Sequence, residues 1–304
     1  MPPVTSLSEL VERARAAGPC RLVVPAAESE TALQAAVEAR RRGLAEPLLL
    51  GDRDGVVSLL YRLEEDPGRY EVVHLPDDAA AAREAVALCR RGEAQVILKG
   101  RLSTGALLRA VLDRDRGLRT GHLLSDVMLS EHPEAPRLLG ITDGGVNVAP
   151  TLAEKRGIVE NAVRVFRRLG VERPVVAAVC AVETVVEAMP HTVEARALAE
   201  MAERGEIEGC DLLGPLALDN ALYAWAARAK GIAHPMAGRA DVLLVPTIEA
   251  GNLLGKAFTY LGRKAVAHVI EGARVPVLIP SRVERAEDKL LSIALGAIAA
   301  RERP

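Results

Sequence analysis

Short apolar runs alternate with longer amphipathic stretches along most of the chain. The runs are rich in Val and Leu and end at Pro, Gly or a charged residue, as buried strands do. The longer stretches repeat their apolar residues at helical spacing. This alternation is typical of βαβ units around a mostly parallel sheet, so we predict an α/β fold. The predicted strands are 22–25, 47–50, 71–75, 96–98, 175–179, 241–245 and 275–279.

The amphipathic stretches define helices and a domain boundary. Two strand-like runs, 122–129 and 137–142, follow each other directly, which predicts an antiparallel pair inserted into the parallel scheme. The loop-like sequence after this pair places a domain boundary near residue 143. We therefore expect one domain formed by 1–143 plus 286–304 and a second formed by 144–285. The predicted helices are 29–42, 77–91, 103–113, 151–169, 192–204, 218–230 and 286–301.

Composition narrows the functional classes. The 304 residues carry a net charge of −2 and contain only 2 Phe, 1 Trp and 4 Tyr, which leaves little surface for stacking bases. A nucleic-acid partner is therefore not expected. No apolar run approaches the roughly twenty residues of a membrane span. The N-terminus lacks the apolar segment of a signal peptide, so we expect a cytoplasmic protein. The four cysteines are widely spaced, without a CxxC pair, and are expected to be reduced.

Residues 241–258 are predicted to run from a strand through a turn into a helix, with Gly251 and Asn252 at the helix entrance. Free backbone N–H groups at such an entrance can hold a phosphate. The stretch GNLLGKA is not a Walker A loop, because its glycine spacing is one residue short and Ala257 replaces the Ser or Thr. A turn that needs glycine only for its geometry remains the alternative.

A second candidate site follows the strand at 275–279. Ser281 and Arg282 come directly after the strand, and a guanidinium at this position could hold an anion. Asp288 lies seven residues after Ser281, in the first turns of the next helix, where it could act as a general base. The alternative is that Glu287 and Asp288 only complement the helix dipole.

A third candidate site follows the strand at 96–98. Lys99 ends this strand, Thr104 lies at the start of the next helix, and Arg109 lies within that helix. These residues would attract anions, although Arg109 could equally be a solvated surface charge. The chain has no GxSxG, HExxH or GxGxxG motif, and its six histidines are not paired at metal-ligand spacing. Several strand ends carry residues suited to binding phosphate, and the sequence has no metal-binding or dinucleotide-binding motif. This combination indicates a phosphorylated ligand.

Five stretches in order resemble the phosphate acetyl/butyryltransferase family, and the butyryltransferase branch more closely. Any one of them is weak, whereas the ordered set over about residues 90–300 is specific. The stretches are KGRLSTGALLRAVLDRDRGLRTG, ITDGGVNVAPTLAEK, GPLALDNA, VPTIEAGNLLGKAFTYL and PSRVERAEDKLLSIALGA.

The resemblance implies a two-domain fold like that of isocitrate/isopropylmalate dehydrogenases, with a cleft between the domains and a homodimer or higher oligomer formed through domain 144–285. It implies the reversible reaction acyl-CoA + phosphate ⇌ acyl phosphate + CoA, with CoA as a substrate and no tightly bound cofactor or metal. The catalytic positions would be Ser281, Arg282 and an acid, either Asp288 or Glu287. The candidate CoA-binding positions are Lys99, Thr104, Arg109, Gly251, Asn252 and Lys256.

The chemistry of these residues fits such a transfer. The acid would take the proton of the CoA thiol, Arg282 would hold the phosphate, and Ser281 would donate a hydrogen bond to the developing oxyanion. Direct transfer in a ternary complex is the simplest mechanism, because no cysteine lies at a candidate site. Two other classes remain open: a non-catalytic CoA or acyl-phosphate sensor, and a metal- and NAD-dependent decarboxylating dehydrogenase. Within the family, acetyl and butyryl transfer are both possible.

Overall fold

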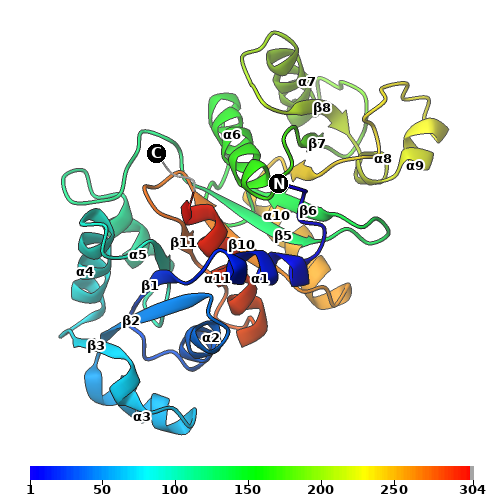
Figure 1. The fold of residues 1–304 in the computed structure, drawn as a ribbon. Coiled ribbons are helices and arrows are strands. Elements are labelled where there is room, and N and C mark those ends of the chain that lie inside the picture. The colour runs from blue at the N-terminus through cyan, green and yellow to red at the C-terminus, as the bar shows by residue number, and fades with distance from the viewer. Residues whose placement is uncertain (302–304) are drawn as a thin grey trace. The chain divides into compact units, whose positions relative to one another are not determined.

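The chain forms two compact α/β units in a computed structural model that describes residues 1–301. The central unit consists of Met1–Leu7 and Leu123–Ala265, and the terminal unit of Ser8–His122 together with the chain from Val266 onward. Figure 1 shows both units as sheets with helices packed against them. Within residues 1–301, none of the helices is both long and apolar enough to cross a membrane.

The sheet of the terminal unit has the strand order β3-β2-β1-β4-β11-β10. All neighbouring strands in it are parallel except β10 and β11. Strand β1 lies between β2 and β4. After β1 the chain adds β2 and β3 on one side of it, and then adds β4 on the other side. This reversal is a topological switch point, where loops at the strand ends separate and ligands bind in α/β proteins. The strands are β1 (Cys20–Pro25), β2 (Ala45–Gly51), β3 (Glu71–His74), β4 (Val96–Leu98), β10 (Ala267–Glu271) and β11 (Val277–Leu278).

Helices cover this sheet in two groups. Helix α11 packs against α2, β4 and β10, and α4 packs against α5 and β1. Every residue of α11 from Leu290 to Ala299 except Leu291 is buried, so the helix forms the centre of its layer. Gly296 lets it approach the sheet, because a Cβ there would lie only 3.0 Å from a methyl of Val96. The helices are α1 (Leu7–Ala16), α2 (Glu30–Arg41), α3 (Arg53–Arg62), α4 (Asp78–Arg90), α5 (Thr104–Val111) and α11 (Ala286–Arg301), with a 3₁₀ turn η1 at Pro67–Arg69.

The sheet of the central unit has the order β5-β6-β9-β7-β8. Strands β5 and β6 are antiparallel, and the other pairs are parallel. The strands are β5 (Ser125–Glu131), β6 (Leu138–Thr142), β7 (Val175–Val179), β8 (Asp211–Leu216) and β9 (Val242–Leu244). The helices are α6 (Leu152–Arg168), α7 (Pro190–Glu203), α8 (Leu218–Leu222), α9 (Ala224–Ala229) and α10 (Ile248–Lys256), followed by a π-helical turn η2 (Ala257–Leu261).

The antiparallel pair predicted from the sequence is confirmed as β5–β6, but the unit boundaries differ from those expected. The chain changes units after His122 and after Ala265, about twenty residues before the expected positions at 143 and 285. The reason is strand pairing. Strand β6 pairs with β9, which keeps the β5–β6 hairpin in the central unit, and β11 pairs with β4, which returns β10 and β11 to the terminal unit.

Candidate functional site

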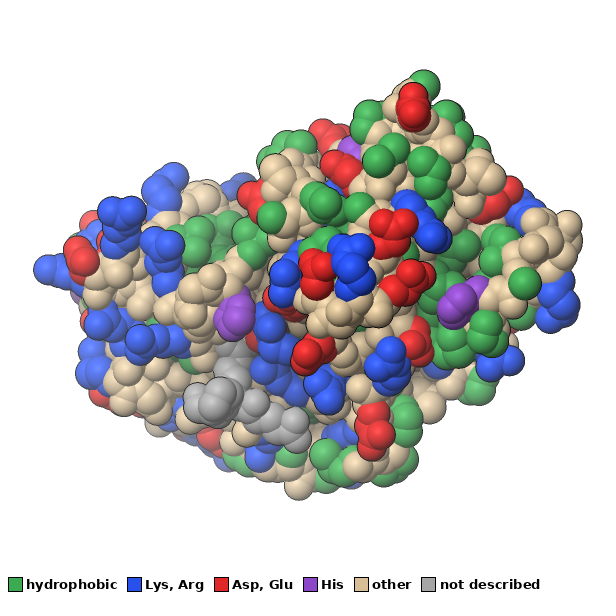
Figure 2. All heavy atoms as spheres, turned by 90° about the horizontal axis from the view of Figure 1, so that it is seen from above, with side chains coloured by type: hydrophobic (Ala, Val, Ile, Leu, Met, Phe, Trp, Pro, Cys, Tyr) green, Lys and Arg blue, Asp and Glu red, His purple; other side chains and the backbone are tan. Residues whose placement is uncertain are grey.

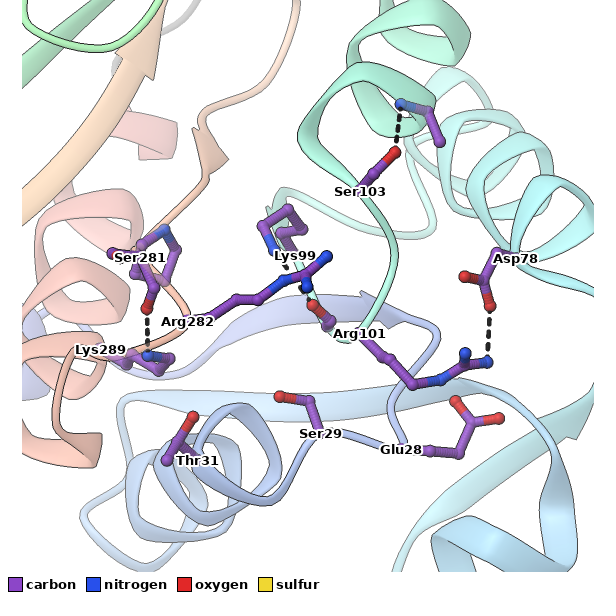
Figure 3. A pocket seen from close by; sticks show the side chains of 13 residues that line it. Glu28, Ser29, Thr31, Asp78, Lys99, Arg101, Ser103, Ser281, Arg282 and Lys289 are labelled. Carbon is purple, nitrogen blue, oxygen red and sulfur yellow. Dashed lines mark hydrogen bonds and ion pairs between the residues drawn. The ribbon is translucent and has the colours of Figure 1, made fainter.

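A pocket of about 520 Å³ opens in the terminal unit where β1, β4 and β11 end. These three parallel strands are neighbours, so their carboxyl ends lie at the same edge of the sheet. Figure 3 shows polar and charged side chains from three loops facing this space. The pocket is lined by Glu28, Ser29, Thr31, Asp78, Lys99, Gly100, Arg101, Ser103, Ala106, Pro280, Ser281, Arg282 and Lys289.

Lys99 follows β4 directly and lines the pocket although only 6% of it is exposed. Its Nζ donates to the carbonyl oxygens of Gly100 and Leu102, both at 3.3 Å. Burial lowers the pKa of Lys99, and the charges of Arg282 and Lys289 lower it further, while Glu284 acts in the opposite direction. An ammonium among other cations, with only neutral carbonyls as hydrogen-bond partners, favours an anionic ligand.

Ser281 and Arg282 enter the pocket from the loop that follows β11. The strand ends at Leu278, and both residues after Pro280 are exposed. In Figure 3 the Arg282 side chain runs across the pocket toward Lys99. The Ser281 backbone N–H donates to Glu284 Oε1 at 2.9 Å, which fixes the backbone of this loop. Lys99, Ser281 and Arg282, which the sequence placed in two separate candidate sites, thus line one pocket.

Two helix N-termini also face the pocket. Ser29 precedes α2 and makes no side-chain cap, while Ser103 caps α5 by accepting from the Ala106 N–H at 3.2 Å. The positive ends of both helix dipoles thus add to the cationic side chains. At the rim, Arg101 pairs with Asp78 at 2.7 Å. The pocket as a whole is suited to binding a phosphate or a carboxylate.

Asp288 does not line this pocket. Its side chain is 1% exposed, with Oδ2 3.0 Å from Arg285 Nε and Oδ1 3.2 Å from the Val266 backbone nitrogen. The first contact bonds the carboxylate to the loop just before α11, and the second bonds it to the segment that precedes β10. The seven-residue spacing from Ser281 therefore places Asp288 near the site in sequence, while its carboxylate is engaged elsewhere.

Glu287 lies on another side of α11. It lines a separate cavity of about 390 Å³ together with Gln34, Arg41 and Leu63. Successive helical residues point about 100° apart, so Glu287, Asp288 and Lys289 cannot share one direction. The residue of this acidic stretch that reaches the pocket is Lys289, which the sequence interpretation did not include.

Thr104 and Arg109 lie beside the pocket without lining it. Thr104 is the first residue of α5 and Arg109 lies in its last turn, and both are exposed. The residue of this helix start that lines the pocket is Ser103, which precedes Thr104. Arg109 thus fits the solvated alternative left open by the sequence.

The expected helix entrance at Gly251 is wrong. Helix α10 begins at Ile248, and the Gly251 N–H already donates to the Thr247 carbonyl at 3.1 Å. Gly251 is needed for a different reason, because a Cβ there would lie 2.7 Å from the Cα of Gly144. Asn252 Nδ2 donates to the Gly144 carbonyl at 3.4 Å, so α10 is joined directly to the loop that follows β6. Gly251 thus lies within the helix, where the close approach of Gly144 requires glycine.

Lys256 ends α10 in the central unit and is exposed. Its Nζ lies 5.9 Å from the centre of the Tyr260 ring, a cation–π contact at the surface. Within residues 1–301, Lys256 forms no ion pair with an acidic side chain.

A larger groove of about 910 Å³ lies along α4, but its charges are mixed. Four arginines line it (Arg83, Arg90, Arg91 and Arg116) together with Glu84, Asp113 and Asp115. Figure 2 shows Lys and Arg side chains gathered on the part of the terminal unit that carries α4 and α5, at the left of the view. Such a surface attracts anions at long range, whereas the smaller pocket offers buried cations that can hold one.

Several pocket residues escaped the sequence analysis. Glu28 and Ser29 lie in the loop between β1 and α2, and Arg101 lies in the loop after β4, so these three come shortly after a predicted strand, while Thr31 is in the first turn of α2. That position was the available signal, because the ends of parallel strands meet at one edge of the sheet. Asp78 and Lys289 lie on helices and gave no comparable signal.

With the pocket defined, comparison with known proteins identifies the family. A sequence profile described as phosphate acetyl/butaryl transferase matches residues 78–297, more than two thirds of the chain. The chain belongs to this family. The phosphate butyryltransferase of Clostridium acetobutylicum is 39% identical to it over 297 residues, covering 98% of this chain and 99% of the relative. The phosphate acetyltransferase of Rhizobium meliloti is 42% identical over 294 residues, covering 97% and 93%.

A solved structure agrees with this assignment. The branched-chain phosphotransacylase from Enterococcus faecalis V583 superposes with a TM-score of 0.83 at 31% identity, covering 93% of this chain and 99% of that one. The mixed α/β fold is thus that of the phosphate acetyl/butaryl transferase family. The identities to the two relatives are similar, so they do not distinguish the butyryl from the acetyl branch.

Proposed function

We propose that this protein is a phosphate acyltransferase that moves a short acyl group reversibly between CoA and inorganic phosphate. The observation that carries the proposal is the convergence of Lys99, Ser281 and Arg282 on one pocket, in a chain of the phosphate acetyl/butaryl transferase family. Two of these side chains are cationic, and two helix N-termini face the same space. Phosphate and acyl phosphate are the anions that this reaction requires.

In the direction of acyl phosphate synthesis, a phosphate oxygen attacks the thioester carbonyl carbon. The C–S bond breaks, and the CoA thiolate leaves and takes up a proton. In the reverse direction the thiolate attacks the carbonyl carbon of the acyl phosphate, the bond from that carbon to the bridging oxygen breaks, and inorganic phosphate leaves. Lys99 and Arg282 would hold the phosphate, and the Ser281 hydroxyl would donate a hydrogen bond to the oxyanion that forms between the two steps.

The group that takes the thiol proton stays a prediction, with Asp288 and Glu287 as the candidates. Asp288 would first have to leave Arg285, whereas Glu287 faces another cavity. For CoA itself, Thr104, Arg109, Gly251, Asn252 and Lys256 also stay predictions. The Gly251 N–H would have to exchange its existing hydrogen bond for a ligand.

The cysteines support direct transfer. Burial raises the pKa of Cys20 and Cys210 to about 11 and that of Cys89 to about 12. Burial also raises the pKa of Cys180. A thiol becomes an effective nucleophile only as the thiolate, so these four side chains are poor acyl acceptors near neutral pH. A covalent acyl-cysteine intermediate is therefore disfavoured, and both substrates would bind together.

Further features remain predictions from the family resemblance. They are the isocitrate/isopropylmalate dehydrogenase-like arrangement with its cleft, the absence of a tightly bound cofactor, the cytoplasmic location and the homodimer. The dimer prediction gains support from large apolar side chains on the central unit, where Trp225, Leu253 and Leu261 are 62%, 69% and 84% exposed. Sedimentation velocity would test it, since a monomer at micromolar concentration would contradict it.

The experiment that tests the function is a thiol-release assay with acetyl-, propionyl-, butyryl- and branched-chain acyl-CoA. Release that depends on added phosphate supports an acyltransferase, and the preferred chain length identifies the branch. CoA binding by calorimetry without turnover on any substrate would instead support a sensor, and reduction of NAD a dehydrogenase.

A further inference from the structure

The loop from Ser281 to Glu284 forms a turn that its own residues close. The Glu284 backbone N–H donates to the Ser281 carbonyl at 3.2 Å, and the Ser281 N–H donates to Glu284 Oε1 at 2.9 Å. Two hydrogen bonds in opposite directions thus join the two ends of the turn. The exposed residues Arg282 and Val283 lie between them.

Lys289 binds the backbone of this turn. Its side chain comes from the first turns of α11, is 3% exposed, and donates from Nζ to the carbonyl oxygens of Ser281 and Glu284, both at 2.8 Å. Figure 3 shows the contact with Ser281 at the edge of the pocket. A single ammonium therefore binds both ends of the turn and fixes it to the helix.

The two catalytic candidates on the turn depend on this arrangement. Within residues 1–301, neither the Ser281 hydroxyl nor the Arg282 guanidinium has a hydrogen-bond partner. Their placement is therefore set by the backbone of the turn alone. A displacement of about 1 Å at a reacting group can cost on the order of 10²-fold in rate.

Stability alone does not account for Glu284. Its Oε2 is buried without a hydrogen-bond partner in the described part of the chain, and its Oε1 lies 3.8 Å from His268 Nε2. A buried carboxylate oxygen without a partner lowers the stability of a fold. Lys289 is similar, because burial lowers its pKa and so disfavours the charged form that makes both contacts. Two costly charges at one turn indicate a functional demand.

We propose that Glu284 and Lys289 are positioning residues that hold the Ser281–Arg282 turn in the conformation needed for acyl transfer. This inference rests on the proposed function, since it assigns these two side chains to the same reaction. Helix α11 is mostly buried between Leu290 and Ala299, and it packs on α2 and the sheet. The helix therefore stays anchored without Lys289, and the loss of Lys289 affects mainly the turn.

The test compares matched variants in the thiol-release assay, with urea unfolding of each. Lys289→Met keeps the length of the side chain and removes its donors, Glu284→Ala removes the acceptor, and Glu284→Gln keeps an acceptor oxygen. Lys230→Met is the control, because Lys230 makes surface ion pairs with Glu183 and Asp219 in the central unit. We expect kcat to fall by about 10- to 100-fold for Lys289→Met and about tenfold for Glu284→Ala, with KM for acyl-CoA changed less than about threefold.

Glu284→Gln should recover kcat to within about threefold of the wild type, and Lys230→Met should equal the wild type. A folded Lys289→Met with wild-type kcat would overturn the proposal, as would equal kcat values for Glu284→Ala and Glu284→Gln. If Lys289→Met does not fold, the comparison of kcat between Glu284→Ala and Glu284→Gln decides the proposal. If the wild type releases no thiol, the proposed function fails instead. The positioning role is then decided by calorimetry with inorganic phosphate, where Glu284→Ala should bind more weakly than Glu284→Gln, and equal affinities would refute it.

Discussion

The carboxylate of Asp288 forms a two-point ion pair with Arg285, with Oδ2 3.0 Å from Nε and Oδ1 3.2 Å from Nη2. The aspartate is 1% exposed, while the arginine side chain is 63% exposed. The pair therefore ties the start of α11 to the loop before it. Asp288 Oδ1 also accepts a hydrogen bond from the Val266 N–H, which links the start of α11 to the segment that precedes β10.

Replacing the two adjacent acids should have different effects on stability. Asp288→Asn weakens charge-assisted hydrogen bonds at a buried site and should lower the free energy of unfolding by about 1–3 kcal/mol. Glu287→Gln alters an exposed side chain and should change it by less than about 0.5 kcal/mol. Urea unfolding followed by circular dichroism measures both. The assignment of Asp288 as a buried partner of Arg285 would be wrong if the two variants were equally stable.

The same two variants identify the base. Only the variant that removes the proton acceptor should lose the rise of the rate that accompanies ionisation of the carboxylate, because the rate then follows the fraction of CoA present as thiolate. The rate profile of thiol acylation by acyl phosphate shows this directly. Profiles like the wild type for both variants would exclude a carboxylate base at either position.

Arg282→Gln should reduce turnover by about 10²-fold or more, since a neutral amide cannot stabilise the departing phosphate charge. Stability should be retained, because Arg282 is exposed and makes no hydrogen bond within residues 1–301. Steady-state kinetics with phosphate and acyl-CoA checks the first expectation, and a thermal melt checks the second. An unchanged kcat would remove Arg282 from the mechanism.

Lys99 should make phosphate binding weaken at alkaline pH. Its pKa is lowered by burial and by two neighbouring cations, so it loses its charge at a lower pH than an ordinary lysine at about 10.4. We expect KM for phosphate to rise as the pH passes that lowered pKa. Lys99→Arg keeps its charge throughout and should show no such rise. Identical pH profiles for both proteins would contradict the role of Lys99 as a phosphate ligand.

The same shift has the opposite effect on stability. The folded protein binds the Lys99 proton more weakly than the unfolded chain does, so the charged form costs stability below the lowered pKa. Stability from this group should therefore increase as the pH rises through that pKa toward the value of the unfolded chain. Urea unfolding of the wild type and Lys99→Met at several pH values would isolate this contribution.

Gly251→Ala should destabilise the central unit by about 1–3 kcal/mol, because the new methyl would overlap the backbone of Gly144 and Asp143. Gly105→Ala in α5 is the matched control. A Cβ there meets only the flexible Arg109 side chain at 3.6 Å, and alanine favours helix, so stability should rise by about 0.5–1 kcal/mol. Equal melting temperatures for the two variants would contradict the close packing of α10 on the loop at Asp143 and Gly144.

Hydrophobic patterning was sufficient for most of the parallel sheet and for the β5–β6 hairpin, because buried strands and amphipathic helices leave direct periodic signals. Strand β8 was missed because Gly214 and Pro215 interrupt it. A proline is tolerated there since β8 is the last strand of its sheet, where one side of the backbone has no strand partner. Helix α10 was predicted to begin too late, because glycine at position 251 suggested a turn and its packing against Gly144 depends on tertiary structure.

The site was predictable as far as strand ends determine it. Lys99, Ser281 and Arg282 follow β4 and β11, and parallel strands bring such residues together. Residues on the following helix are harder to assign, because a shift of one position rotates a side chain by about 100°. The sequence therefore favoured Asp288 and Glu287, whereas Lys289 is the α11 residue in the pocket.

The most direct test of acyl transfer to phosphate is ³¹P NMR of the wild-type protein with butyryl-CoA and inorganic phosphate, with thiol release measured in parallel. The account predicts an acyl phosphate signal that grows at the same rate as free CoA, and that is lost in Arg282→Gln. Thiol release at the same rate without phosphate, or with no acyl phosphate formed, would contradict it.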